Sequence, residues 1–461
     1  MNRISRRTYF VFVLALILLI GVGAFTVKYF IHCGRWATYP RNELLFAKEI
    51  TTDYQMRDRN GVLLYSSGDK SYANDSYLRK AVLHLTGDKA RNIPAVALDY
   101  YRDDMVGYNP ITGLYYSNPG TGTEYLSVSA NAQTTALSLL NGRRGCVGVY
   151  NYKTGEILCA VSASTFDPCD PPSADTIESS DYYNGVYTNR FFSRSYTPGS
   201  IFKLVTAAAV IEKIPDYETK TWHCGGTLEI SGGTVTCSSA HGDLTMDQAL
   251  AQSCNCAFAQ MALELGPDVL EKYADKAGIC DSIFIDGYET KKGSFDLSGA
   301  SNWDVAWAGI GQGSGEHNDL INPCQYMTFM GAIANGGKAA KPYLVSQVES
   351  DGSVSYTAST RKLPKMIEQS TAKIIRQMMR NNTLTMYGAI NVPDVCAKSG
   401  TAEVSMDGSV ANTATFAGFI DNDQYPLAFI VIVEEGGSGS QAAAPIANGV
   451  LWACMSAMDN E

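Results

Sequence analysis

The chain has 461 residues, of which 45% are hydrophobic and 18% charged, so it is long enough for two or three domains with substantial cores. This mixed composition excludes collagen-like, coiled-coil and intrinsically disordered chains. The 36 basic and 46 acidic side chains give a formal net charge of −10. Nucleic acid is therefore not expected as a partner, because phosphate binding requires clustered lysine and arginine.

A long apolar segment at residues 9–30 follows three arginines within the first seven residues. At about 1.5 Å per residue, a helix of this length spans the ~30 Å hydrocarbon core of a membrane. The positive-inside rule then makes residues 1–8 a cytoplasmic tail and sends the rest of the chain across the membrane. A cleaved signal peptide is the alternative, because Val22–Ala24 resembles a cleavage site. Since the apolarity continues past that site, we expect an uncleaved, single-pass anchor.

Residues 31–125 carry short strand-like runs broken by proline and glycine. They predict a small membrane-proximal domain, which could include segments from elsewhere in the sequence. Within it, residues 57–65 read as strand, Asn-Gly turn and strand. The pattern changes at residue 126. A helix is predicted at 128–140, followed by a hairpin of two apolar strands within 145–163.

After a polar loop, we predict Thr197 as an N-cap with Pro198 at the first helical position, at the start of a buried helix up to residue 213. Further helices are predicted at 246–265, 268–277, 323–334, 369–381 and 442–458, and strands at 395–404, 413–420 and 427–434. The order of these elements is a hairpin, several helices, three strands and a final helix. This order indicates an α+β fold in which helices pack on an antiparallel sheet. We assign this fold to one domain over residues 126–461.

Twelve cysteines on an exported chain raise the question of disulfides, although no C-x-x-C occurs. Cys224 and Cys237 bracket a predicted hairpin at 225–236, which could bring their Cβ atoms within bridging distance, so we expect this pair to form a disulfide. One alternative is a zinc site with four N and S ligands, from His223, Cys224, Cys237 and His241. The other alternative is that Cys224 and Cys237 are both free thiols. Cysteines such as Cys254 are interpreted as small hydrophobic residues.

Three short motifs occur in order: Ser200-x-x-Lys203, Ser253-x-Asn255 and Lys398-x-Gly400. Each is weak alone, since similar patterns recur elsewhere in the chain. Context favours these copies, because Ser200 opens a buried helix and Lys398 begins a strand of the final sheet. A serine hydroxyl needs a base to become nucleophilic, and Lys203 lies one helical turn away on the same face. Burial and the second cation, Lys398, would both lower the pKa of Lys203.

The remaining motif residues suggest supporting roles. We expect Ser253 to relay a proton to the leaving group, and Asn255 to hold the substrate amide and steady Lys203. On the last strand, the hydroxyls of Ser399 and Thr401, together with the positive charge of Lys398, suit a substrate carboxylate. Gly400 is expected to leave space for an extended peptide that pairs along the strand.

The segments Tyr196–Lys203, Ser253–Asn255 and Lys398–Glu403 resemble the three active-site motifs of the penicillin-binding proteins. The similarity extends to four further segments: Lys153–Leu158, Gly309–Gly313, Ala334–Gly337 and Ala443–Ile446. The short preceding domain and single anchor resemble the monofunctional, class B enzymes, of the penicillin-binding protein A type. Ser399 stands where many relatives have threonine, and both offer a hydroxyl.

This resemblance implies a peptidoglycan D,D-transpeptidase with the penicillin-binding transpeptidase and serine β-lactamase-like fold. Ser200 would attack the carbonyl between the two terminal D-alanines of a stem peptide, and a neighbouring amine would resolve the acyl-enzyme into a cross-link. β-Lactams would acylate the same serine. The backbone N–H groups of Ser200 and Thr401 would form the oxyanion hole. No cofactor and no metal are expected, and the implied partner is a membrane glycosyltransferase of the SEDS type.

Several alternatives use the same motifs. A D,D-carboxypeptidase passes the acyl group to water, and only groove shape distinguishes it. A class A β-lactamase needs a glutamate in an E-x-x-x-N loop, a pattern that does not occur after Ser253. The non-catalytic alternatives are a β-lactam sensor, for which the predicted cytoplasmic tail is short, and a scaffold for wall synthesis.

Overall fold

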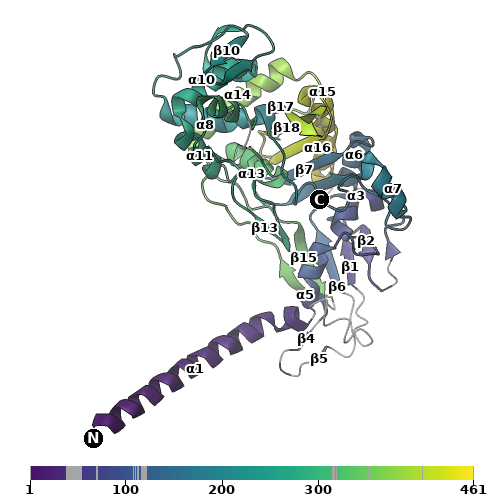
Figure 1. Ribbon diagram of the computed structural model, residues 1–461. Coiled ribbons are helices and arrows are strands. Elements are labelled where there is room, and N and C mark those ends of the chain that lie inside the picture. The colour runs from purple at the N-terminus through teal and green to yellow at the C-terminus, as the bar shows by residue number, and fades with distance from the viewer. Residues whose placement is uncertain are drawn as a thin grey trace.

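The computed structural model describes residues 2–37, 54–68, 71–106, 108–109, 111, 114–115, 122–313, 317, 319–350, 352–406 and 409–459. Residues 38–53 of the predicted membrane-proximal domain therefore lie outside the described residues. Helix α1 (Asn2–Ala37) extends from the body of the molecule as one long helix (Figure 1). Among the described residues, its Arg7–Phe30 part is the one helix long and apolar enough to cross a membrane, which fits an anchor or a signal sequence.

A five-stranded antiparallel sheet forms the centre of the body, in the order β17-β18-β19-β7-β8. The strands are β17 (Val395–Met406), β18 (Ser409–Ile420), β19 (Leu427–Val433), β7 (Gly145–Asn151) and β8 (Ile157–Ala163). Helices cover both of its faces, so every residue of β7, β8 and β19 is buried. Burial on both faces explains why these strands read as continuous apolar runs instead of alternating patterns. The predicted α+β fold is confirmed.

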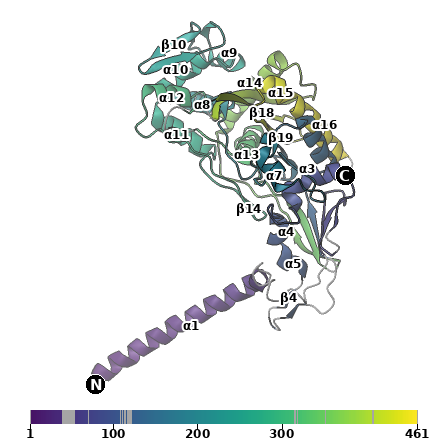
Figure 2. The same ribbon diagram turned by 45° about the vertical axis from the view of Figure 1, so that its right-hand side comes forward.

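Two separate cores lie on the two faces of this sheet. Helices α6 (Ala130–Leu140) and α16 (Ala444–Asp459) pack on one face, where Val147 and Val149 point. Helix α13 (Pro323–Ala334) packs on the opposite face, as Figure 2 shows. This part of the chain also contains three shorter elements: the helices α7 (Ala174–Ser179) and α15 (Gly439–Ala442) and the turn η1 (Asp181–Tyr183).

A largely helical lobe continues the core on the α13 side, drawn in teal and green in Figure 1. Its helices are α8 (Lys203–Lys213), α9 (Met246–Ala251), α10 (Asn255–Leu265), α11 (Pro267–Lys276), α12 (Asn302–Ala308) and α14 (Gln369–Met386). Its strand pairs are β9 (Trp222–Cys224) with β12 (Gly242–Leu244), β10 (Thr227–Ile230) with β11 (Gly233–Thr236), and β13 (Phe284–Ile285) with β14 (Tyr288–Glu289). The predicted hairpin at 225–236 is confirmed by β10 and β11.

The single helix predicted at 246–265 is wrong, because a turn separates α9 from α10. Ser253 in that turn has a φ of 51°, a left-handed conformation that ends a helix. The side chain of Cys254 then caps α10, since its Sγ accepts a hydrogen bond from the Ala257 N–H at 3.4 Å. Periodicity alone could not reveal this break, because apolar residues continue through it.

A second, six-stranded sheet has the order β16-β15-β6-β1-β2-β3. Its strands are β1 (Tyr54–Arg57), β2 (Leu63–Ser66), β3 (Ser71–Tyr72), β6 (Gly122–Leu126), β15 (Val345–Ser350) and β16 (Ser353–Thr357). The hairpin predicted at 57–65 is confirmed by β1 and β2. Because β15 pairs with β6, this sheet combines two stretches of chain that are far apart in sequence. Helices α3 (Ser76–Thr86), α4 (Val96–Tyr100) and α5 (Arg102–Val106) and the pair β4 (Tyr108–Asn109) and β5 (Leu114–Tyr115) belong to the same N-terminal region.

One buried carboxylate ties the second sheet to the central one. Asp58 is 1% exposed, and its Oδ1 accepts hydrogen bonds from the N–H groups of Asn60 at 2.9 Å and Val62 at 2.8 Å. Its Oδ2 accepts from the N–H of Ala130, the first residue of α6, at 3.0 Å. Asp58 therefore fixes the β1–β2 turn against a helix that covers the central sheet.

Replacing this carboxylate tests how much the link contributes. Asp58→Ala leaves three backbone N–H groups without their charged acceptor, so we expect the free energy of unfolding to fall by at least about 2 kcal/mol. Urea unfolding of the full-length chain in detergent measures the change. Asp75→Ala is the matched control, because Asp75 is an exposed N-cap that accepts one bond, and its loss should cost about 1 kcal/mol. Equal losses in the two variants would contradict the role of Asp58.

Candidate active site

Ser200 lies in a tight turn instead of a capped helix. The 3-10 turn η2 (Gly199–Phe202) precedes α8, and Thr197 provides no side-chain cap, so the predicted N-cap is wrong. Gly199 has a φ of 60°, and a Cβ at this position would overlap the carbonyl oxygen of Thr401 on β17. In 3-10 geometry, residues three apart eclipse one another. The turn therefore places Ser200 in line with Lys203 more directly than an α-helix would.

The side chain of Lys203 is fully buried and joins two of the motifs. Its Nζ lies 3.1 Å from Ser200 Oγ, 2.7 Å from the Ser253 carbonyl oxygen and 2.7 Å from Asn255 Oδ1. The two carbonyl oxygens can only accept hydrogen bonds. They engage both N–H donors of a neutral amine and leave its lone pair for a hydroxyl. The Asn255 amide is held in this orientation because its Nδ2 donates to the Thr236 carbonyl at 2.9 Å.

The two lysines of the site lie on either side of the Ser253 hydroxyl. Lys398 Nζ donates to Ser253 Oγ at 2.9 Å, and Lys203 Nζ lies 3.3 Å from the same oxygen. Burial, followed by repulsion from Lys398, holds the pKa of Lys203 well below its ordinary value of 10.5. Burial lowers the pKa of Lys398 to about 7. The three predicted motifs are thus brought together by direct contacts.

Strand β17 lies at the edge of the central sheet, beside η2. The Thr401 carbonyl accepts a hydrogen bond from Gln312 Nε2 at 3.3 Å, so it points away from β18. The N–H of a strand residue points to the same side as its carbonyl, and the Thr401 N–H therefore faces the outer edge as well. Gly400 leaves no room for a side chain, because a Cβ there would overlap Thr415 Oγ1 and approach the Pro198 carbonyl. Its missing side chain lets η2 approach β17.

Sequence reasoning misses Tyr387, which supports the third motif. The Ser399 N–H donates to the Tyr387 hydroxyl oxygen at 2.9 Å, and the two hydroxyl oxygens lie 3.1 Å apart. If the tyrosine hydroxyl donates to Ser399 Oγ, the serine keeps its own proton for a ligand. Burial raises the pKa of Tyr387, which keeps this donor protonated. No sequence signal identifies it, since it follows α14 and is one of 27 tyrosines.

The predicted disulfide between Cys224 and Cys237 is not formed, and both residues are free thiols. Each Sγ lies 3.5 Å from His241 Nδ1. The alternative zinc set is also wrong in one member, because the His223 ring is exposed and pairs with the Asp243 carboxylate at 2.7 Å. In its place, Cys254 of the second motif joins the group.

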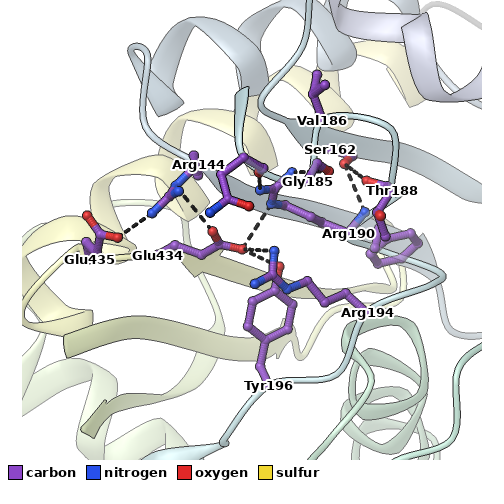
Figure 3. Close-up of polar contacts among 12 residues, drawn as sticks. Arg144, Ser162, Gly185, Val186, Thr188, Arg190, Arg194, Tyr196, Glu434 and Glu435 are labelled. Carbon is purple, nitrogen blue, oxygen red and sulfur yellow. Dashed lines mark hydrogen bonds and ion pairs between the residues drawn. The ribbon is translucent and has the colours of Figure 1, made fainter. Parts of the chain in front are cut away.

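The segment that leads to Ser200 is fixed by a buried carboxylate, Glu434, directly after β19 (Figure 3). Glu434 Oε1 accepts from the Tyr196 hydroxyl at 2.9 Å and from Arg190 Nε at 2.9 Å. Two further guanidinium groups approach it, from Arg194 at 3.1 Å and Arg144 at 3.4 Å. Burial alone would raise the pKa of Glu434, but Arg190 and Arg194 together hold it below its ordinary value. Since Tyr196 is four residues before Ser200, this cluster anchors the turn η2.

Removing the charge of Glu434 should destabilise the protein strongly. Glu434→Gln leaves buried arginines without a counter-charge, for which we expect a loss of about 3–5 kcal/mol at neutral pH. The lowered pKa of Glu434 means that the difference between wild type and variant is complete above 4.5, the unfolded value, and shrinks as the pH falls through the folded value.

Urea unfolding of the full-length chain in detergent, repeated across this pH range, measures that difference. Glu435→Gln is the matched control, because the Glu435 side chain is 53% exposed and its pair with Arg144 should contribute at most about 1 kcal/mol. If the difference in unfolding free energy between wild type and Glu434→Gln did not change with pH, the lowered pKa of Glu434 would be contradicted.

The chain is similar to several known proteins. The chain is 28% identical over 342 residues to peptidoglycan D,D-transpeptidase PbpA of Mycolicibacterium smegmatis, with 68% of this chain and 67% of that protein covered. It is 26% identical over 443 residues to stage V sporulation protein D of Bacillus subtilis, with 88% and 66% covered.

Two solved structures share the fold. The D,D-transpeptidase domain of a peptidoglycan glycosyltransferase from Eggerthella lenta has a TM-score of 0.75 at 24% identity, covering 89% of this chain and 100% of that one. The penicillin G acyl-enzyme of penicillin-binding protein A from M. tuberculosis has a TM-score of 0.74 at 21% identity, covering 87% and 99%. The profile of the penicillin-binding protein transpeptidase domain matches residues 145–451, a range that contains all three motifs. The chain therefore belongs to the penicillin-binding protein transpeptidase family.

Proposed function

We propose that this protein is a D,D-transpeptidase that cross-links peptidoglycan through an acyl-enzyme on Ser200. The observation that carries this proposal is the position of the buried Lys203 amine, 3.1 Å from Ser200 Oγ. The same amine also contacts the Ser253 carbonyl oxygen and Asn255 Oδ1, which can only accept hydrogen bonds. Such an amine is a base for the hydroxyl of Ser200. Peptidoglycan transpeptidases among the curated relatives support the substrate class.

In the first half-reaction, Lys203 accepts the hydroxyl proton as Ser200 Oγ attacks the carbonyl between the terminal D-alanines. The backbone N–H groups of Ser200 and Thr401 stabilise the oxyanion, and one such donor typically contributes ~10²–10³ in rate. Ser253, in contact with both lysines, passes the proton to the departing D-alanine amine. In the second half-reaction an acceptor amine attacks the ester, forms the new amide and returns a proton to Ser200.

The substrate is proposed to lie along the outer edge of β17 as an added strand. Lys398 and the hydroxyls of Ser399 and Thr401 bind its carboxylate. Thr401 Oγ1 accepts from the Gly439 N–H at 3.4 Å, which leaves its own proton for the substrate. Asn255 uses one amide proton for Thr236, and the second is available to the substrate amide. β-Lactams enter the same position, as the acyl-enzymes of penicillin-binding protein A with penicillin G and imipenem suggest.

We further propose that α1 stays in the membrane as an uncleaved anchor, with residues 1–8 in the cytoplasm and the catalytic domain outside. The length and apolarity of Arg7–Phe30 and the arginines before it support this orientation. A SEDS-type glycosyltransferase as partner in the same membrane rests on the resemblance to class B enzymes.

Labelling with a fluorescent penicillin tests the nucleophile. The full-length protein in membranes should acquire a label that persists, and Ser200→Ala should acquire none because the attacking oxygen is gone. Ser195→Ala is the matched control, since Ser195 bonds the Lys292 carbonyl outside the site and its loss should leave labelling intact.

Label on Ser200→Ala would contradict the proposal, and rapid loss of label from the wild type would favour a β-lactamase. A D-Ala-D-Ala stem peptide supplied with an amine acceptor then separates the two remaining enzymes. A cross-linked product identifies a transpeptidase, whereas trimming alone identifies a carboxypeptidase.

The rate of acylation should depend on pH in both directions. It should rise as Lys203 loses its proton, at a pKa well below 10.5, and fall again above about pH 7 as Lys398 loses the charge that binds the substrate carboxylate. Lys398→Arg keeps a positive charge throughout this range, so its slower acylation should lack the alkaline fall. Second-order labelling rates across the pH range measure both profiles. An alkaline fall of the same shape in Lys398→Arg would contradict this assignment.

A further inference from the structure

We propose that Cys224, Cys237, His241 and Cys254 form a structural zinc site next to the second active-site motif. Their four ligand atoms all lie within 4.8 Å of one another. Cys224 ends β9, Cys237 follows β11, and His241 precedes β12. Cys254 lies between Ser253 and Asn255. The site therefore joins a peripheral hairpin to two residues of the active site.

The distances match those of a tetrahedral zinc ion. Zinc–sulfur bonds of about 2.3 Å and zinc–nitrogen bonds of about 2.0 Å place tetrahedral sulfurs about 3.8 Å apart, and sulfur and nitrogen about 3.5 Å apart. Cys237 Sγ and Cys254 Sγ are 3.8 Å apart, and His241 Nδ1 lies 3.5 Å from both Cys224 Sγ and Cys237 Sγ. A disulfide would require a sulfur separation of about 2.05 Å. The cluster has the spacing of a metal site and not that of a cross-link.

The surroundings of the ligands suit zinc as well. His241 Nε2 lies 3.1 Å from Ser239 Oγ, which can accept a hydrogen bond from this nitrogen, and the tautomer protonated at Nε2 leaves Nδ1 for the metal. The backbone N–H of Asn255 donates to Cys237 Sγ and that of Ala257 donates to Cys254 Sγ, each at 3.4 Å. Three thiolates and a neutral imidazole around Zn²⁺ carry a net charge of −1, and binding releases the three thiol protons to solvent.

Binding at this site would fix the geometry of the second motif. The amide of Asn255, which contacts Lys203, donates to the Thr236 carbonyl, and Thr236 is the residue before Cys237. The zinc ion would hold Cys237 and Cys254 together and so maintain this contact. Cys254 is therefore a positioning residue, because it acts through Asn255 and Ser253.

Metal analysis of the full-length protein, purified in detergent without chelators, tests the site directly. We expect about one zinc per chain in the wild type, and less than half of that in Cys237→Ser and His241→Ala. Co²⁺ substituted into the wild type should give thiolate charge-transfer absorption and the visible bands of a tetrahedral site. Cys280→Ser is the matched control, because Cys280 is a free, half-buried thiol outside the cluster, and it should retain its zinc.

His241→Cys guards against variants that lose metal only because they misfold, since four thiolates also bind zinc tetrahedrally and this variant should keep it. Three results would overturn the proposal: a wild type that contains no zinc and gives no cobalt spectrum, one that contains iron or copper instead, or a disulfide among these cysteines by mass spectrometry. Equal zinc loss in Cys280→Ser would do the same.

The positioning role needs a separate readout that does not depend on zinc content. Removal of zinc from the wild type by a chelator should slow labelling by fluorescent penicillin, by up to about a hundredfold, and added zinc but not magnesium should restore it. Unchanged labelling after verified zinc loss would overturn this role. Ser200→Ala should retain its full zinc content without labelling, so failure of the zinc site and failure of the proposed enzyme activity are distinguishable.

Discussion

The active site depends on one buried amine. Lys203 is fully buried, yet it contacts Ser200, the Ser253 carbonyl and Asn255, so it connects a turn before α8 with a turn before α10. An isolated ammonium at this depth would be strongly destabilised, and burial therefore favours the neutral form that a base requires. The two carbonyl acceptors orient that neutral amine. The same contacts of Lys203 thus make the site reactive and hold its two turns together.

The central sheet provides the rigid frame for these turns. Its edge strand β17 carries the third motif, and the absence of side chains at Gly199 and Gly400 lets η2 approach it closely. Glu434, directly after β19, holds Tyr196 and thereby the chain just before η2. Since β17, β18 and β19 pair in register, the nucleophile and the substrate-binding edge are positioned by one continuous hydrogen-bonded unit.

The amino-acid sequence is a good guide to features that depend on local pattern. Continuous apolar runs, turn residues and three short motifs are sufficient to place the hairpins, the final sheet and the residues around Lys203. Features that depend on distant contacts were not accessible. The break at Ser253 lies inside an apolar helical pattern, and the turn at Gly199 depends on Thr401 about two hundred residues later.

The same limit applies to residues that act by proximity. Tyr387 supports Ser399 only because α14 packs against β17, and Cys254 meets Cys237 only because a hairpin folds back over the second motif. Spacing suggested His223 for the cysteine cluster, whereas its side chain points to Asp243 at the surface. Sequence neighbours are therefore a poor guide to this cluster, because its members come from three separate turns.

The mixed origin of the six-stranded sheet has a consequence for how the protein can be divided. Strand β15 leaves the catalytic region, pairs with β6 on one side and with β16 on the other, and then returns. A shortened chain that starts after residue 126 would lose β1, β2, β3 and β6 together and leave one edge of β15 without a partner. An open strand edge of this kind recruits other chains. The natural unit for expression and crystallisation consequently begins before β1 and not at the boundary that motif content suggests.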